Sequence, residues 1–234
     1  MFEKKDMGIE FKKVSKIYNK GLIKVEALKD ISVNINNGEL LAVIGVSGSG
    51  KSTILSLIGG LDLPTTGEII VNGVRLSDLN PDALAEYRQR KVGFIFQSFN
   101  LIPTLNILEN VMLPLVPIKM SAEDKKERAM AAIKEVNIEE RINHLPGELS
   151  GGEQQRVAIA RGLVNNPSII LADEPTGDLD TKTGEKIILL LRKLNYEKNC
   201  TIIIATHDPK IADLTERKIV LEDGKIVKEI SCGK

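Results

Sequence analysis

Short apolar segments separated by small and polar residues characterise the first part of the chain. We expect strands over Ile9 to Val14, over Ile31 to Ile35 and over the continuous apolar run Leu40 to Ile44. Asn-Asn-Gly at residues 36–38 marks a turn between the last two of these strands. The pattern therefore predicts a sheet edge that leads into a buried strand.

A glycine-rich segment over residues 45–52 changes the period of the pattern. After it, Ile54, Leu55, Leu57 and Ile58 share one side of a predicted helix. The elements expected next are a turn over Pro64 to Gly67, a strand over Glu68 to Val71, a helix from Pro81 through Arg90 capped by Asn80, and a strand over Val92 to Phe96. Strand, glycine loop and helix follow each other in the order that a phosphate site needs.

Helical patterns dominate the stretch after Gln97. Ser121, with Asp124 three residues later, resembles a capping box for an amphipathic helix over Ala122 to Val136, and a second helix is expected to begin close to Gly151-Gly152. The predicted organisation is one domain of residues 1–234 with two lobes, a helical lobe of about residues 98–165 inserted into a core lobe of about residues 1–97 and 166–234.

The last part of the chain alternates strands and helices. Ile169 to Leu171 is a short apolar run between Pro167 and Asp173, which is typical of a strand buried on both faces in a parallel sheet. The elements expected after it are a helix over Thr183 to Leu194, a strand over Thr201 to Ala205, and strands around Ile219 to Leu221 and Lys225 to Val227 that flank an Asp223-Gly224 turn. The sequence contains no internal repeat or low-complexity tract.

Composition excludes several classes of protein. With 42% apolar and 27% charged residues, the 234-residue chain is typical of a globular protein and can bury a hydrophobic core. Its 32 basic residues cancel 32 acidic ones, so no overall field favours nucleic acid or an anionic membrane surface, and no nucleic-acid partner is expected. The first residues contain no signal peptide and no apolar run is long enough to span a bilayer, which predicts a cytoplasmic location.

The two cysteines carry no sign of chemistry. Cys200 and Cys232 show no paired spacing of the kind found in metal sites or disulfide frameworks. We expect Cys200 to face the core and Cys232 to lie in the C-terminal tail.

The clearest chemical motif is Gly-Val-Ser-Gly-Ser-Gly-Lys-Ser at residues 45–52. It fits the pattern G-x-x-x-x-G-K-[ST], in which the loop turns its backbone N–H groups inward around phosphate oxygens. The helix that begins at Lys51 directs its positive end at the same oxygens, Lys51 adds a full charge, and Ser52 can place its hydroxyl on Mg²⁺. The predicted ligand is a nucleoside triphosphate, and the predicted binding residues are Gly45, Ser47, Gly48, Ser49, Gly50, Lys51, Ser52 and Thr53.

Two acidic residues close the apolar run that ends at Ala172. Asp173 stands where a strand end would deliver a carboxylate to the metal ion of the phosphate loop. Glu174, directly after it, can accept a hydrogen bond from an attacking water and polarise it. An acidic cap before the next turn is the structural alternative, and the pair by itself is a weak signal.

The segment Leu149 to Arg156, Leu-Ser-Gly-Gly-Glu-Gln-Gln-Arg, offers a second helix N-terminus to an anion. With this segment the chain resembles the ATPases of ABC transporters, whose signature motif is L-S-G-G-Q or L-S-G-G-E. The resemblance covers nearly the whole chain. Its further motifs, in the order of the family, are Tyr18 as an adenine-stacking aromatic, Gln97 after its strand, Gly-Asp-Leu-Asp at residues 177–180, and His207 after its strand.

The resemblance implies a fold and roles for individual residues. The implied fold class is α/β: a P-loop NTPase of the ABC type whose mixed sheet core, a RecA-like lobe plus an antiparallel β lobe, carries an inserted helical lobe. The implied catalytic residues are Glu174, His207, Lys51 and Gln97, the implied metal ligands are Ser52, Gln97 and Asp173, and the implied nucleotide contacts outside the phosphate loop are Tyr18, Ser150, Gly151, Gly152 and Asp180. Phe11 is the alternative to Tyr18 as the stacking aromatic.

The resemblance also implies partners. Two copies of the chain related by a two-fold axis would enclose two ATP molecules, with Ser150 and Gly152 of one copy on the terminal phosphate held by the other. A separate membrane permease would dock near Gln97 and the helical lobe and hold the chain at the inner face of the membrane. Residues 97–115 resemble the branch that serves lipoprotein release, macrolide or antimicrobial-peptide export and cell-division control.

Other classes of protein fit less well. A soluble P-loop kinase shares the glycine loop but has no use for residues 149–156. A chromosome-maintenance ATPase needs a long coiled coil, and no sustained heptads occur here. A translation factor that acts on the ribosome normally carries two such cassettes and a basic linker. A system that regulates the cell wall or cell division stays open as an alternative to transport.

Overall fold

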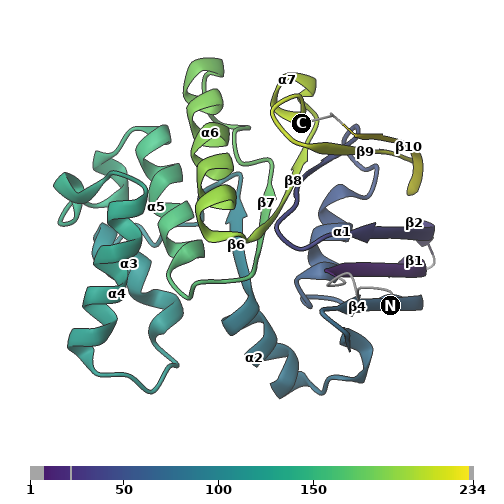
Figure 1. Ribbon diagram of the computed structural model, residues 1–234, viewed down its shortest axis with the longest axis horizontal. Coiled ribbons are helices and arrows are strands. Elements are labelled where there is room, and N and C mark those ends of the chain that lie inside the picture. Colours follow the sequence, from purple (N-terminus) through teal and green to yellow (C-terminus); the bar gives the residue numbers. More distant parts are fainter. Residues whose placement is uncertain (1–7, 22, 232–234) are drawn as a thin grey trace, which may run out of the picture.

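The computed structural model describes residues 8–21 and 23–231 of the chain. Three layers follow one another across the molecule (Figure 1): a group of helices, a central sheet with helices on both faces, and an antiparallel sheet. Cys232, which was expected in the tail, lies outside the described residues. Within the described ranges, no helix has the length and apolar character needed to cross a membrane.

The central sheet has six strands in the order β10-β9-β3-β8-β7-β6. Five of them are parallel, and β10 joins the edge antiparallel to β9. Their bounds are Leu40–Ile44 for β3, Val92–Phe96 for β6, Ile169–Asp173 for β7, Thr201–Thr206 for β8, Arg217–Glu222 for β9 and Lys225–Ser231 for β10. The strands β3, β6, β7 and β8 therefore end on one edge, where parallel sheets place their ligands.

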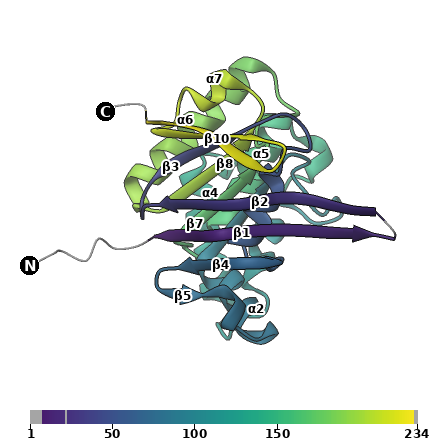
Figure 2. The same cartoon turned by 90° about the vertical axis from the view of Figure 1, so that its right-hand side faces the viewer.

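A second, four-stranded sheet has the order β2-β1-β4-β5 and is antiparallel throughout (Figure 2). Its strands are β1 (Ile9–Lys20), β2 (Ile23–Ile35), β4 (Thr66–Val71) and β5 (Val74–Arg75). The long β1–β2 pair extends well beyond the expected ends at Val14 and Ile31. The strands continue through polar residues because each supplies hydrogen-bond partners to the other, as in the pair Tyr18↔Val25.

Seven helices complete the described part of the chain: α1 (Lys51–Ile58), α2 (Pro81–Lys91), α3 (Ile107–Met112), α4 (Ala122–Glu135), α5 (Gly151–Leu163), α6 (Thr181–Lys198) and α7 (Pro209–Ala212). Short 3-10 turns lie at Leu76–Asp78, Leu113–Leu115, Glu139–Arg141 and Pro146–Glu148. Ser121 caps α4 as predicted, its hydroxyl accepting from the backbone N–H of Asp124. The carboxylate of Asp124 accepts from that hydroxyl, whereas a capping box would have it accept from the backbone N–H of Ser121.

Alternating residues of the central strands build two separate cores. Ile202 and Ile204 of β8 pack into the core that contains α4, α5 and α6, whereas Ile203 and Ala205 pack into the core shared by α1 and the antiparallel sheet. A strand that is buried on both faces has apolar residues at nearly every position. This explains why β3, β7 and β8 appear in the sequence as continuous apolar runs. Cys200 is buried in the first core, as predicted.

Candidate functional site

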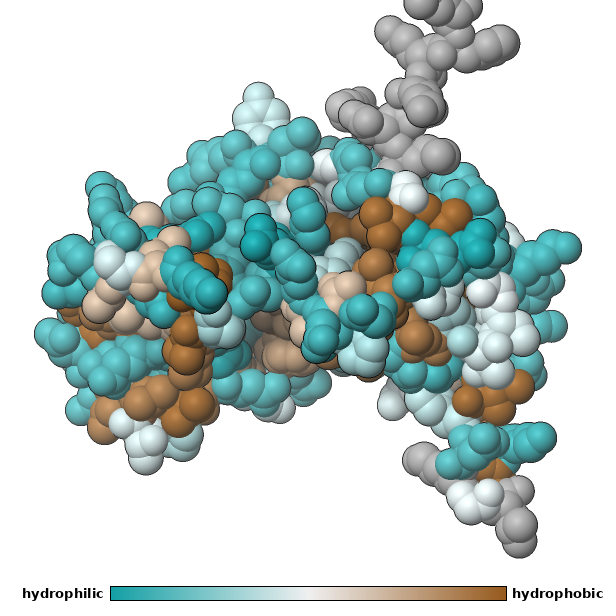
Figure 3. Space-filling view, turned by 90° about the horizontal axis from the view of Figure 1, so that it is seen from below, coloured by the Kyte–Doolittle hydropathy of each residue, from teal (hydrophilic) through white to brown (hydrophobic). Residues whose placement is uncertain are grey.

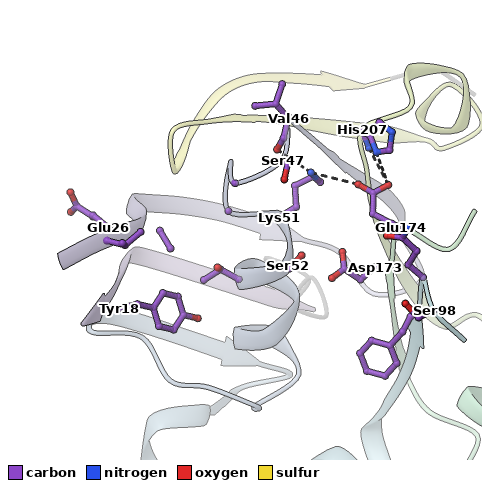
Figure 4. Close-up of a pocket in the computed structure, with 17 residues that line it drawn as sticks. Tyr18, Glu26, Val46, Ser47, Lys51, Ser52, Ser98, Asp173, Glu174 and His207 are labelled. Carbon is purple, nitrogen blue, oxygen red and sulfur yellow. Dashed lines mark hydrogen bonds and ion pairs between the residues drawn. The ribbon is translucent and has the colours of Figure 1, made fainter. Parts of the chain in front are cut away.

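A cavity of about 1020 Å³ opens at the edge where the parallel strands end (Figure 4). It is large enough for a nucleotide-sized ligand. The cavity draws residues from the antiparallel sheet, the glycine loop, α1 and the ends of β6, β7 and β8. The residues that line it are Tyr18, Val25, Glu26, Ala27, Val46, Ser47, Gly48, Gly50, Lys51, Ser52, Thr53, Phe96, Gln97, Ser98, Asp173, Glu174 and His207.

The glycine loop connects β3 to α1 in a conformation that side chains would obstruct. Gly50 has φ +109°, and a Cβ there would lie 2.6 Å from the carbonyl oxygen of Ala27. At Gly45, a Cβ would lie 2.5 Å from the carbonyl oxygen of Leu221. Because Gly50 occupies the N-cap of α1 and has no side chain, the first N–H groups of this helix are left to an external acceptor. The loop therefore presents an anion-binding end to the cavity.

Lys51 is a cation with little exposure at the start of α1. Its Nζ donates to the carbonyl oxygens of Gly45 (2.8 Å) and Val46 (3.2 Å), which holds the side chain along the inside of the loop. The same nitrogen lies 3.6 Å from Oε1 of Glu174. The ammonium group is thus placed at the floor of the cavity, between the loop and the end of β7.

Asp173, the last residue of β7, is a carboxylate that lacks a full set of partners. Its Oδ1 atom is buried and has no hydrogen-bond partner. Burial raises the pKa of Asp173 and the neighbouring charge of Glu174 adds to the rise, while a hydrogen bond with Ser52 and the charge of Lys51 oppose it. A buried carboxylate with a free oxygen beside a hydroxyl is the oxygen-rich donor set that a divalent cation such as Mg²⁺ takes. These residues fit such an ion.

Glu174 and His207 face each other across the ends of two neighbouring strands. Nδ1 of His207 lies 3.0 Å from Oε2 of Glu174, and the backbone N–H of His207 donates to the same oxygen at 3.4 Å. Glu174 has a left-handed backbone with φ +47°, a conformation that costs free energy and concentrates at functional sites. Its N–H donates to the carbonyl oxygen of Ala205, which fixes the turn after β7. Figure 4 shows the carboxylate of Glu174 between Lys51 and His207.

Tyr18 is the aromatic residue that lines the far end of the cavity, with its ring turned toward the space in front of α1 (Figure 4). Phe11, the alternative, is 2% exposed in the core and cannot reach a ligand there. The neighbouring wall is formed by Val25, Glu26 and Ala27 of β2, which sequence reasoning missed. The alternation of apolar and polar residues over 23–27 is the signal that could have extended this strand.

Gln97 follows β6 and lines the cavity at the side of the helical layer. Its Nε2 donates to Oδ1 of Asp178 at 2.8 Å, and a Cβ added to Gly177 would lie 2.9 Å from the Gln97 side chain. Gln97 therefore connects the cavity to the segment 177–180. Phe96 and Ser98, on either side of it, also line the cavity and were not predicted.

Gly45 and Ser49 belong to the glycine loop but do not line the cavity, and Ser49 is buried. The other predicted residues that lie outside the cavity belong to two further helix starts. Ser150 caps α5 in a capping box with Glu153, and Asp180 caps α6 by accepting from the N–H groups of Lys182 and Thr183. The two helix starts are neighbours, since a Cβ on Gly152 would lie 2.6 Å from Cγ2 of Thr183. Ser150, Gly151, Gly152 and Asp180 are thus grouped with each other and not with the phosphate loop.

The glycine loop, the acidic pair and the separate serine-glycine helix start define an ATPase cassette, and the chain belongs to the ABC transporter family, whose sequence model matches residues 28–177. It is 52% identical over 225 residues to the uncharacterized ABC transporter ATP-binding protein MJ0796 of Methanocaldococcus jannaschii, an alignment that covers 94% of this chain and 96% of the relative. It is 44% identical to the macrolide export ATP-binding/permease protein MacB of Syntrophobacter fumaroxidans, and there the alignment covers 94% of this chain but 31% of the relative.

Solved structures agree with this assignment. The dimeric structure of MJ0796, a bacterial ABC transporter cassette, has a TM-score of 0.87 at 50% identity and covers 95% of this chain and 98% of that one. A dimeric structure of the same cassette in a post-hydrolysis state bound to ADP and Pi has a TM-score of 0.87 at 49% identity, with the same coverage. The predicted family and fold class are confirmed, and the chain is an ATP-binding, ATP-hydrolysing ABC transporter subunit. The MacB relative supports the predicted branch.

Proposed function

We propose that two copies of this chain close around ATP and that hydrolysis powers a separate membrane permease. The observation that carries the proposal is the separation of two half-sites on one chain. The phosphate loop, Asp173 and Glu174 line the cavity, whereas Ser150 and Gly152 start a helix outside it. A second copy turned by a two-fold axis would bring its Ser150–Gly152 segment to the open side of the first copy's cavity. The dimeric structures of MJ0796 support this arrangement.

Within each site, the residues divide the work of phosphoryl transfer. Lys51 and the N–H groups of the loop stabilise the charge on the phosphates, and Tyr18 stacks on the adenine. Glu174 accepts a hydrogen bond from the attacking water, while His207 orients Glu174 and reaches the terminal phosphate. Asp173, Ser52 and Gln97 would hold Mg²⁺, and when bound this ion neutralises part of the phosphate charge.

A second groove on the molecule is the proposed docking site for the permease. A groove of about 870 Å³ lies between α2, the edge strand β6 and the helical layer, and Leu61, Phe94 and Pro114 contribute apolar surface to it. Seen from below, apolar side chains gather on the helical side and toward the antiparallel sheet (Figure 3). Leu61 is 54% exposed and lines the groove together with Phe94 and Pro114, and apolar surface that is gathered in one place marks an interaction site. The proposed occupant is a short cytoplasmic helix of the permease.

The groove is also connected to the nucleotide cavity. Arg161 lines the groove and donates to the carbonyl oxygens of Phe99 (2.6 Å) and Asn100 (2.5 Å), which follow Gln97 by two and three residues. Both of these residues have left-handed backbones, with φ +58° and +51°. A change in the groove would therefore act on the loop that carries Gln97. We treat residues 98–165 as the lobe that transmits motion between ATP and permease.

One relative supports a role in export. MacB is named a macrolide export protein, and it joins an ATP-binding part and a permease in one chain. By analogy, the cargo proposed here is a lipoprotein, a macrolide or an antimicrobial peptide, handled by a permease with a large extracytoplasmic domain. The chain would then be cytoplasmic and peripheral, held at the inner face of the membrane by its permease.

Purification of the tagged chain from detergent-solubilised membranes of its native cells tests the proposal. The expected result is an integral membrane protein with a large extracytoplasmic domain that co-elutes with the wild type and is lost with Leu61→Asp. Leu189→Asp, at a residue of α6 with 52% exposure, is the matched control and retains the partner. Ribosomes or DNA in place of a membrane protein would support the non-transport alternative and contradict the proposal.

A further inference from the structure

Lys16 and Tyr18 lie two residues apart on β1, so their side chains leave the same face of the antiparallel sheet. Nζ of Lys16 lies over the Tyr18 ring, 5.0 Å from its centroid. Tyr18 lines the nucleotide cavity, whereas Lys16 is not among the residues that line it. One face of the ring is therefore covered by an ammonium group, and the other face is left for a base.

Asp62 holds Lys16 in this position. Its Oδ1 accepts from Nζ of Lys16 at 2.6 Å and from the N–H of Leu63 at 2.8 Å, and Nζ also donates to the carbonyl oxygen of Leu63 at 2.8 Å. The Lys16 side chain is only 12% exposed. An ion pair with so little exposure is weakly screened by solvent, so its geometry is fixed more firmly than that of a surface pair.

The same carboxylate reaches the Tyr18 hydroxyl. Burial and the hydrogen bond to Asp62 raise the pKa of Tyr18, and the Tyr18 hydroxyl is also hydrogen-bonded to Thr53. Although burial alone would raise the pKa of Asp62, the hydrogen bonds from Lys16, Leu63 and Tyr18 together hold it below its ordinary value. The lowered pKa keeps Asp62 ionised, and its carboxylate accepts from Lys16 and from Leu63.

These contacts connect the Tyr18 end of the nucleotide cavity to the helix that follows the phosphate loop. Thr53 belongs to α1, the helix that begins at the phosphate loop, and Asp62 follows this helix closely in the chain. The ring of Tyr18 is thereby held at its face by Lys16, and Asp62 and Thr53 lie close enough to its hydroxyl to act on its pKa.

We propose that Lys16 and Asp62 are positioning residues that hold the Tyr18 ring in place for stacking on the base of ATP. The inference rests on the proposed stacking role of Tyr18. A ring that is already fixed loses little freedom when the base binds, which favours binding. Neither residue touches the phosphates, so the contribution belongs to nucleotide binding and not to the rate of hydrolysis.

Binding measurements with two ligands test this inference. Lys16→Met keeps the length and apolar stem of the side chain, and we expect it to bind ATP about fivefold more weakly while its affinity for inorganic tripolyphosphate, which has no base, is unchanged. Lys16→Arg retains a cation over the ring and restores ATP binding. Lys12→Met, on the same strand but paired with Glu10 at the surface, is the control and leaves both affinities at the wild-type level.

A double variant separates positioning from general stability. If Lys16 acts through the ring, Lys16→Met has no further effect on ATP binding in a Tyr18→Ala background. An equal loss of ATP and tripolyphosphate affinity, or a loss that persists without the Tyr18 ring, would overturn the inference. If Tyr18→Ala binds ATP as tightly as the wild type, the stacking role itself is wrong, and this outcome is distinct from failure of Lys16 alone.

Discussion

Nδ1 of His207 lies 3.0 Å from Oε2 of Glu174, at the ends of two neighbouring parallel strands. The other oxygen of Glu174 lies 3.6 Å from Nζ of Lys51. One carboxylate is thus held between the two side chains that are proposed to contact the terminal phosphate. The arrangement places a base, a cation and an imidazole where the phosphate loop would deliver an ATP molecule.

Glu174→Gln tests the proposed base. The amide keeps the size of the side chain but cannot accept a proton, so we expect ATP hydrolysis to fall by about a hundredfold or more while ATP still binds. Steady-state hydrolysis and equilibrium binding measure the two effects. Glu197→Gln, at an exposed acid of α6, is the matched control and keeps wild-type turnover. Near wild-type turnover of Glu174→Gln would show that another group activates the water.

His207→Ala removes the partner of the base. Without the imidazole, Oε2 of Glu174 loses its 3.0 Å side-chain contact and keeps only the 3.4 Å contact from the backbone N–H of residue 207. We expect hydrolysis to slow by about tenfold to a hundredfold, less than the loss of the base itself. ATP affinity is expected to change less than turnover, because the phosphate loop and Tyr18 stay in place. A variant that hydrolyses ATP at the wild-type rate would contradict the role given to His207.

Asp173→Asn is expected to raise the stability of the ligand-free fold while lowering ATP hydrolysis. Burial raises the pKa of Asp173, so its ionised form is disfavoured in the fold relative to the unfolded chain. The stability linked to this group is present at low pH and is lost as the pH rises through the raised pKa. We expect the ligand-free Asn variant to melt at a higher temperature than the wild type at pH 7, and the difference to shrink toward the ordinary aspartate pKa of 3.8.

The same variant is expected to need a higher Mg²⁺ concentration for ATP hydrolysis and to lose most of its turnover, since Asn removes a charge that would hold the ion. Thermal melts without nucleotide and metal titrations of turnover measure the two properties. An Asn variant that is less stable than the wild type at pH 7 would show that Ser52 and Lys51 offset the cost of burying the Asp173 carboxylate.

Gly93→Ala tests how closely the helical layer packs on the central sheet. A Cβ at Gly93 of β6 would lie 2.3 Å from the carbonyl oxygen of Gly162 in α5. We expect the free energy of unfolding to fall by about 1–3 kcal/mol, as overpacked sites do. A Cβ at Gly147 meets nothing within 4 Å, so Gly147→Ala is the control, with a change within about 0.5 kcal/mol. Urea unfolding compares the two, and equal stabilities would contradict the packing.

Local patterns in the sequence were sufficient for much of the fold. The buried strands β3, β7 and β8 were predicted from their continuous apolar runs, and α1 from the apolar residues over 54–58 that share one side of a helix. The second halves of β1 and β2 were missed, since they depend on pairing with each other and carry polar residues. The helix α6 begins at Thr181, earlier than the expected Thr183, because Asp180 forms its N-cap. The resemblance had assigned Asp180 to the nucleotide.

The site was predictable where chemistry is encoded in a short segment. The glycine loop, Asp173 and Glu174 could be placed from their own spacing, and the structure brings the acidic pair and residues 46–48 and 50–52 to one cavity. The contributions of Glu26 and Ser98 could not, because they line the cavity only through the way distant strands meet. The Ser150 segment is a different case, since its proposed counterpart is the phosphate loop of a second copy, and spacing along one chain cannot predict a contact between two copies.

The proposed sharing of ATP between two copies is tested most directly by gel filtration of Glu174→Gln with light-scattering detection of mass, with and without ATP. Slow hydrolysis keeps the terminal phosphate in place, so the account predicts a monomer without nucleotide and a dimer with ATP, and a return to monomer when Ser150→Arg is added at the half-site. A Glu174→Gln protein that binds ATP yet remains monomeric over a wide range of ATP concentration would contradict the shared site.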